Sequence, residues 1–249
     1  MSFINSYRPP IRTIDPEPFY GPDPYDVNFM FPIDTSALES DRVLLTPFIP
    51  SIHAQQYIEE TLKNPELERY LPFQPSTISQ LLHFVEYGIR RDPGWVLFAI
   101  TDKGRPDPDF GGGSFAGVIG LLHTSATELC TEIGFVVTFT AFQRTYVTSN
   151  AVGLLLRYCL ELPSPSFPAG LGLRRVVWMA NAVNLKSVAA AERMGFKREG
   201  TLRWVRALPE GKEGYPPREG DSKPKCLGRH SAILSLCWDD WEAGARERG

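Results

Sequence analysis

From Asp41 onward, hydrophobic and polar positions follow a regular pattern. Short apolar runs have the length and the β-branched or aromatic content of strands, at residues 42–48, 95–101, 115–124, 131–137, 174–180, 197–207 and 230–238. Helical spacing or alanine-rich composition predicts helices over residues 51–63, 77–91, 149–160 and 185–194. The resulting order is strand, two helices, three strands, helix, strand, helix, two strands. It predicts an α+β fold, because strands and helices do not alternate regularly.

Two details of this pattern add to the prediction. Ser51 and Thr77 stand where a side-chain cap would open the first and second helices. Residues 174–180 are nearly all apolar beyond two arginines, as expected of an interior strand that is covered on both faces.

The segments outside the regular pattern are rich in proline and glycine. Residues 1–40 interleave prolines with Phe and Tyr, which predicts an extended N-terminal arm draped over a domain of residues 41–249. Residues 104–113 are expected to form a mobile surface loop, and residues 209–228 either a substrate lid or a disordered linker. Several aromatic residues of these segments could line a pocket or simply pack as hydrophobic contacts: Phe19, Tyr20, Tyr25, Phe29, Trp204 and Tyr215.

Composition excludes several classes of function. With 26 basic and 29 acidic residues the net charge is -3, which offers no field for nucleic acid or an anionic membrane. No window approaches the roughly 18 apolar residues of a membrane span, and the first ten residues lack a signal-peptide pattern. The four cysteines and four histidines show no metal-ligand spacing. We expect a cytoplasmic protein without a metal, either monomer or homodimer.

Residues 174–200, RRVVWMANAVNLKSVAAAERMGFKREG, together with EIGF at 132–135 and CWDDW at 237–241, resemble the GNAT acetyltransferases. The resemblance covers roughly residues 41–242 and is closest to the branch of ribosomal-protein N-terminal acetyltransferases and their small-molecule relatives. It implies a mixed central sheet of about six to seven strands flanked by helices. It also implies acetyl-CoA as co-substrate.

In that family, the strands corresponding to residues 131–138 and 174–180 splay apart, and the pantetheine arm of acetyl-CoA lies between them. The resemblance assigns its backbone contacts to Val136 and Val137, and side-chain contacts to Asn181 and Asn184. An unpaired strand edge offers donors and acceptors that the amides of pantetheine can satisfy.

The family's diphosphate loop corresponds to the run Gln143, Arg144, Thr145, Tyr146, Val147, Thr148 and Ser149. Gln143 matches the family pattern, but Tyr146 and Thr148 replace small residues, and a Cβ there obstructs the approach of phosphate to the backbone. Hydroxyl groups, Arg144 and the helix dipole at Ser149 could compensate. The alternative is that this run only caps a helix.

The resemblance also suggests catalytic groups. Glu132 occupies the position of a base that accepts the proton of the amine, although strand alternation allows it to face either the cleft or solvent. Ser187 is the candidate acid that protonates the departing thiolate, since Ala191 stands where the family usually has tyrosine. Asn184 and Ser187 could instead be an ordinary helix cap and its first-turn serine.

The sequence therefore predicts acetyl transfer from acetyl-CoA to a primary amine of a small molecule or a peptide N-terminus, by direct attack on the thioester. One alternative is a degenerate GNAT fold whose altered phosphate loop serves other small-molecule chemistry or ligand binding. A second alternative is an interaction module without a small-molecule cleft. The acceptor is not specified by the scaffold.

Overall fold

The computed structural model describes residues 2–8, 18–107 and 112–248. Its centre is a mixed sheet in the order β1-β2-β3-β4-β5-β7-β6, in which only β4 and β5 run parallel. The strands are β1 Val43–Pro47, β2 Val96–Asp102, β3 Ser114–Ser125, β4 Cys130–Thr138, β5 Arg175–Asn181, β6 Lys197–Ala207 and β7 Gly228–Cys237. The predicted mixed sheet of six to seven strands is confirmed.

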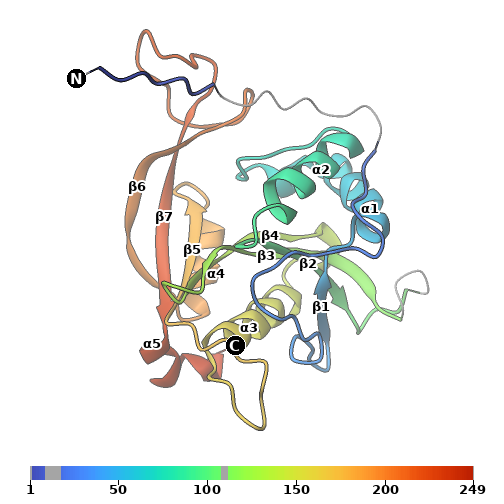
Figure 1. Ribbon diagram of the computed structural model, residues 1–249. Coiled ribbons are helices and arrows are strands. Elements are labelled where there is room, and N and C mark those ends of the chain that lie inside the picture. Colours follow the sequence, from blue (N-terminus) through green and yellow to red (C-terminus); the bar gives the residue numbers. More distant parts are fainter. Residues whose placement is uncertain (1, 9–17, 108–111, 249) are drawn as a thin grey trace.

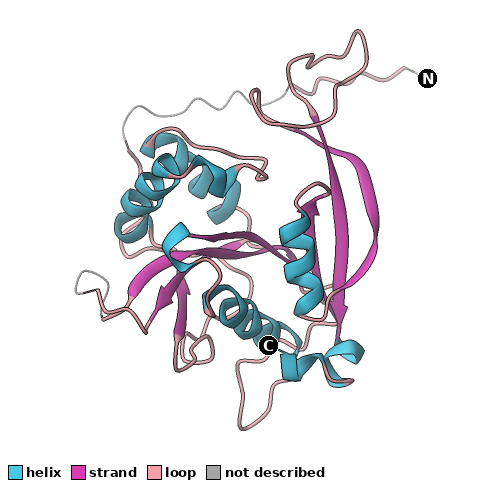
Figure 2. Ribbon diagram, turned by 180° about the vertical axis from the view of Figure 1, so that it is seen from behind, coloured by secondary structure: helices cyan, strands magenta, loops and turns pink. Residues whose placement is uncertain are grey.

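Helices cover both faces of this sheet. They are α1 Pro50–Lys63, α2 Ile78–Phe84, α3 Val147–Leu160, α4 Leu185–Arg193 and α5 Trp238–Glu242. The π-helical segment Val85–Arg90 continues α2, and short 3-10 turns lie at Pro65–Glu68, Thr140–Phe142 and Ala245–Arg248. Figure 1 shows α1 and α2 on one face of the sheet and α3 on the other. Figure 2 shows the same layers from behind.

Two helices begin earlier in the structure than the sequence predicts. α1 begins at Pro50 with Ile49 as its N-cap, not at Ser51, because proline fixes φ for the first helical position and has no N–H to satisfy. α3 begins at Val147, two residues before the predicted start. The start of α2 is confirmed, since the Thr77 side chain accepts a hydrogen bond from the backbone N–H of Gln80.

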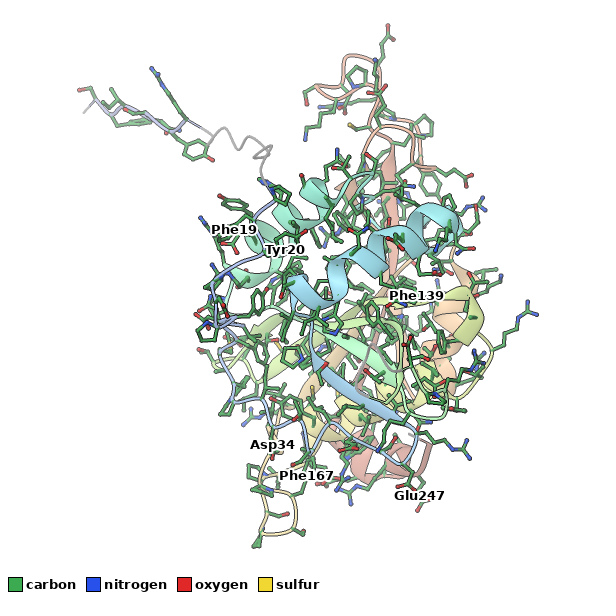
Figure 3. All side chains as sticks on the ribbon, turned by 90° about the vertical axis from the view of Figure 1, so that its right-hand side faces the viewer. Phe19, Tyr20, Asp34, Phe139, Phe167 and Glu247 are labelled. Atoms are coloured by element: carbon green, nitrogen blue, oxygen red, sulfur yellow. The ribbon has the colours of Figure 1, made fainter. Side chains whose placement is uncertain are left out.

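The N-terminal segment packs against the domain from residue 27 onward. Phe29 and Ile33 are partly buried against the core, and Leu38 is fully buried. Tyr158 in α3 donates a hydrogen bond to the carbonyl of Pro32 at 2.7 Å. In Figure 3, the labelled Phe139 lies in the interior beneath α1, where its ring contacts Tyr57 and Phe115 at centroid distances of 6.1 and 5.1 Å.

The parallel pair β4–β5 opens along its length. Its pairing runs from Cys130 with Arg175 to Ile133 with Trp178 and ends there, although both strands continue. Just beyond, β4 carries a bulge: the register with β3 gains one residue between Gly134 and Val137, and Phe135 has a left-handed φ of 48°. The bulge bends β4 away from β5 and leaves facing strand edges unpaired.

Gly117 in β3 pairs with Thr138, just beyond this bulge, and has no room for a side chain. Its φ is +144°, and a Cβ built there would overlap the carbonyl oxygen of Val137 on β4. We expect Gly117→Ala to lower the free energy of unfolding by about 1–3 kcal/mol, because the added methyl group strains the contact between the paired strands β3 and β4. Chemical denaturation checks this, with Gly200→Ala as the control because a Cβ at Gly200 meets nothing within 4 Å. Equal stability of both variants would contradict the packing described.

Every helix of the described residues is too short or too polar to cross a bilayer.

Candidate active site

The opening between β4 and β5 leads into a cleft of about 900 Å³, referred to below as the β4–β5 cleft. One wall is β4 from Ile133 to Thr138, and the other is the end of β5 with the start of α4. The 3-10 turn Pro65–Glu68 and the residues after it close a third side. Val136 and Val137, predicted to offer backbone to a pantetheine arm, both lie in this wall.

The start of α3 forms one end of this cleft. Gln143 lines it and donates from Nε2 to the carbonyl of Thr138 at 3.0 Å, while the hydroxyls of Thr138 and Thr148 share a 2.7 Å hydrogen bond. α3 has no side-chain cap. Within the described chain, no acceptor binds the backbone N–H groups of residues 144, 145, 146, 148 and 149. Free N–H groups at a helix N-terminus form a site suited to an anion.

The side chain of Tyr146 points away from this site. Its hydroxyl donates to Oδ1 of Asp102 at 2.6 Å, and the Arg42 guanidinium lies 4.8 Å from its ring centre. Tyr146 is therefore not among the residues that line the cleft, whereas Thr148 is. The side chains of Arg144, Thr145, Val147 and Ser149 also lie outside the cleft, and Val147 is fully buried in the core.

The predicted residues of β5 and α4 meet on the opposite wall. Asn181, Asn184 and Ser187 all line the cleft. Asn184 is the N-cap of α4, because its side chain accepts from the backbone N–H of Ser187 at 3.2 Å. The Trp178 indole donates to the Ser187 hydroxyl oxygen at 3.0 Å. This bond fixes the oxygen and leaves the hydroxyl proton available to another acceptor. The capping and cleft-lining roles of Asn184 are thus compatible.

Glu132 lies in a second space of about 520 Å³, the inner pocket, which adjoins the β4–β5 cleft: Gly134, Phe135, Met179 and Arg229 line both. Of the two directions that strand alternation allowed for Glu132, the structure shows the buried one, with 7 % of the residue exposed. Ser187 and Glu132 therefore face two connected chambers.

Burial raises the pKa of the Glu132 carboxyl to about 7, and the positive charges of Arg206 and Arg229 offset part of that rise. A carboxyl with a pKa near neutrality changes protonation state readily at neutral pH. This is the property that a general base requires.

Aromatic side chains that the sequence analysis did not single out wall the inner pocket: Phe73, Phe84, Trp95 and Phe135. The aromatic candidates that it did name do not line it. Phe19 and Tyr20 are exposed on the N-terminal segment (Figure 3). Tyr215 stacks on His230 at 4.0 Å. The missed residues come from the α2 region, from the residue just before β2 and from β4, so only the folded chain assembles them.

The segment 209–228 folds back onto the cleft. The buried Lys212 donates from Nζ to the carbonyl of Glu68 at 2.6 Å, and Arg69 forms a bidentate pair with Glu213 at 2.9 and 3.0 Å. Lys223 lines the inner pocket. These contacts anchor the segment beside the site.

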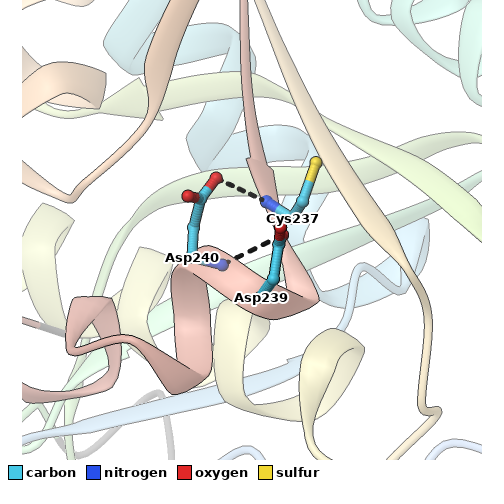
Figure 4. Close-up of side chains that lie close together, drawn as sticks. All are labelled: Cys237, Asp239 and Asp240. Carbon is cyan, nitrogen blue, oxygen red and sulfur yellow. Dashed lines mark hydrogen bonds between the residues drawn. The ribbon is translucent and has the colours of Figure 1, made fainter.

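A group of possible metal ligands lies elsewhere, at the junction of β7 and α5, where Cys237, Asp239 and Asp240 come close together (Figure 4). The Asp240 carboxylate accepts from the Cys237 backbone N–H at 3.4 Å and pairs with Lys197. The backbone N–H of Asp240 donates to the Asp239 carboxylate at 3.1 Å. These contacts explain the cluster as the capping of a short helix.

Both the sequence and the fold of the chain have known counterparts. A family model described as acetyltransferase (GNAT) domain matches residues 42–197. No curated protein matches the sequence.

Solved structures of similar fold include a GCN5-related N-acetyltransferase from Brucella melitensis, at 21 % identity and a TM-score of 0.65, covering 84 % of this chain and 81 % of that one. RimJ of Mycobacterium smegmatis, in complex with CoA-disulfide, has 17 % identity and a TM-score of 0.60, with 83 % and 87 % covered. Spermidine N-acetyltransferase from Vibrio cholerae, in complex with CoA and spermine, has 12 % identity and a TM-score of 0.58, with 82 % and 99 % covered.

Proposed function

Since the matched family model spans more than half of it, the chain belongs to the GNAT acetyltransferase family, and we propose that it transfers acetyl from acetyl-CoA to a primary amine by direct attack. The amine belongs to a small molecule or a peptide N-terminus. The observation that carries the proposal is the connection of two chambers, one with unpaired backbone and one with a buried carboxyl of raised pKa.

The β4–β5 cleft offers groups that suit the chemistry of acetyl-CoA. The unpaired edges at Val136 and Val137 offer backbone groups to the amides of pantetheine. The free N–H groups at the start of α3 offer donors to a diphosphate, with Gln143 beside them. Asn181 and Asn184 face the same channel from β5 and α4. Acetyl-CoA, when bound, supplies an acetyl group activated as a thioester.

The two proposed catalytic side chains have separate tasks. Glu132 removes a proton from the acceptor amine, because only a neutral amine has a lone pair for attack. Ser187 donates its hydroxyl proton to the leaving sulfur, and the indole of Trp178 holds its oxygen in place. Burial in the inner pocket maintains the raised pKa of the Glu132 carboxyl.

The raised pKa of Glu132 predicts the pH dependence of the reaction. Protonated Glu132 cannot accept a proton, so kcat/KM should rise with pH and change slope near pH 7, where the carboxyl ionises. The ionisation of the amine adds its own slope at higher pH. Initial rates between pH 5.5 and 9 check this. A profile with no change of slope between pH 6 and 8 would remove Glu132 from the role of base.

Release of CoA thiol from acetyl-CoA, measured with a panel of primary amines, tests the proposed function. We expect amine-dependent release and an acetylated amine detected by mass spectrometry. Amines that differ in charge and apolar bulk should be included, because those features distinguish the inner pocket. Absence of turnover with every amine, together with absence of acetyl-CoA binding, would favour the degenerate GNAT alternative.

A further inference from the structure

The inner pocket is more positive than an ordinary amine site. Its charged lining side chains are Glu132 and three basic residues, Arg206, Lys223 and Arg229, while most of the remaining lining is apolar or aromatic. A polyamine would bring several positive charges beside these basic groups, and like charges in a partly desolvated space repel strongly. The charge pattern therefore disfavours polycationic acceptors.

Arg229 is the basic residue whose surroundings are unusual. Only 6 % of it is exposed, and its Nε is buried without a hydrogen-bond partner among the described residues. Among the described residues, its guanidinium has no ion-pair partner within 4 Å. Burial, then the neighbouring Arg206, lowers its pKa to about 10, and the nearby negative charge of Glu132 offsets part of that fall. A buried guanidinium whose Nε lacks a hydrogen-bond partner is costly, even with the charge of Glu132 nearby, unless a ligand accepts the missing hydrogen bonds.

A carboxylate is the group best suited to accept the hydrogen bonds that the Arg229 guanidinium lacks. The guanidinium presents parallel N–H donors that match the two oxygens of a carboxylate, and such charge-assisted pairs are among the stronger hydrogen bonds in proteins. Phe73, Phe84 and Trp95 on the wall of the same pocket provide apolar contact for the body of the ligand.

We propose that the acceptor is an amine with an apolar or aromatic body that also carries a carboxylate, and that Arg229 binds this carboxylate with Arg206 beside it. The inference rests on the proposed acetyl transfer, because the same molecule must present its amine to Glu132. Arg229 sets which amine enters the pocket, and Glu132 accepts the proton.

The test separates carboxylate binding from turnover. The full chain is titrated by calorimetry, without acetyl-CoA, with 3-phenylpropionate, which has the aromatic body and the carboxylate but no amine. We expect binding that weakens about tenfold or more in Arg229→Gln. Arg229→Lys keeps the positive charge but lacks the two parallel N–H donors of the guanidinium, so this variant should lose part of the affinity for 3-phenylpropionate. Arg203→Gln is the matched control, since Arg203 lies on the same strand as Arg206 but lines neither chamber.

A second arm compares acetylation of L-phenylalanine with that of phenethylamine, which lacks the carboxylate. The proposal predicts a KM about tenfold lower for L-phenylalanine in the wild type and nearly equal values in Arg229→Gln. If neither amine is acetylated but 3-phenylpropionate binding depends on Arg229, the result contradicts the proposed acetyl transfer to such amines and still supports the carboxylate site. If both are acetylated alike in the wild type and in Arg229→Gln, or if the variant loses affinity for acetyl-CoA and not for 3-phenylpropionate, the carboxylate site is refuted.

Discussion

Glu132→Gln is expected to lower kcat/KM at pH 8 by about 100-fold or more, because it removes the proposed base while preserving the size of the side chain. The residue is buried in the inner pocket, so water does not readily replace it. The change of slope near pH 7 should vanish in the variant, since the group that ionises there is gone. Steady-state kinetics of both proteins over the same pH range provide the measurement.

Loss of folding would not explain such a result. The pKa of Glu132 is raised in the folded protein from 4.5 to about 7, so the folded state binds more protons than the unfolded state between these values. Its contribution to stability is therefore present below pH 4.5 and is lost as pH rises through 7. At pH 8 the glutamine variant should be at least as stable as the wild type. Unchanged kcat/KM in a folded Glu132→Gln protein would rule out the base.

Thr148→Glu is expected to weaken acetyl-CoA binding by about 10- to 100-fold. Thr148 lines the β4–β5 cleft beside the free N–H groups of α3. A carboxylate there would compete for those donors and repel the diphosphate by roughly 1–4 kcal/mol at contact distance. Acidic residues in the first turn favour helix formation, so α3 itself should remain intact. Calorimetric titration with acetyl-CoA gives the dissociation constant.

Thr148→Gln is the matched control, because it has the same bulk and no charge. Both variants lose the hydrogen bond between the hydroxyls of Thr138 and Thr148, so only the charge distinguishes them. The binding constant of the glutamine variant should stay within a few fold of the wild type. Equal affinity of the glutamate and glutamine variants would show that the diphosphate lies away from α3.

The order of elements could be predicted because each depends on local periodicity and buried apolar runs. The open β4–β5 pair followed only from family resemblance, since a strand sequence does not reveal where its pairing ends. The β4 bulge that opens this pair depends on the left-handed φ of Phe135, and no local sequence pattern predicts that conformation. The end of pairing after Ile133 and Trp178 supports that resemblance.

The candidate site was predictable only in part, for a similar reason. Glu132 and Ser187 could be named from motifs, and both lie in connected chambers. The direction of Tyr146 depends on Asp102, which lies 44 residues earlier in the chain. Arg229 follows an irregular segment, and its role depends on side chains from distant elements. Contacts of this kind are set by tertiary packing and leave no pattern in the sequence.

The most direct test of the account is a calorimetric titration of the full wild-type chain with acetyl-CoA. The account predicts saturable binding of one acetyl-CoA per chain, because the unpaired edges of β4 and β5 and the free N–H groups of α3 together form one continuous site. Absence of measurable binding at millimolar acetyl-CoA would contradict it.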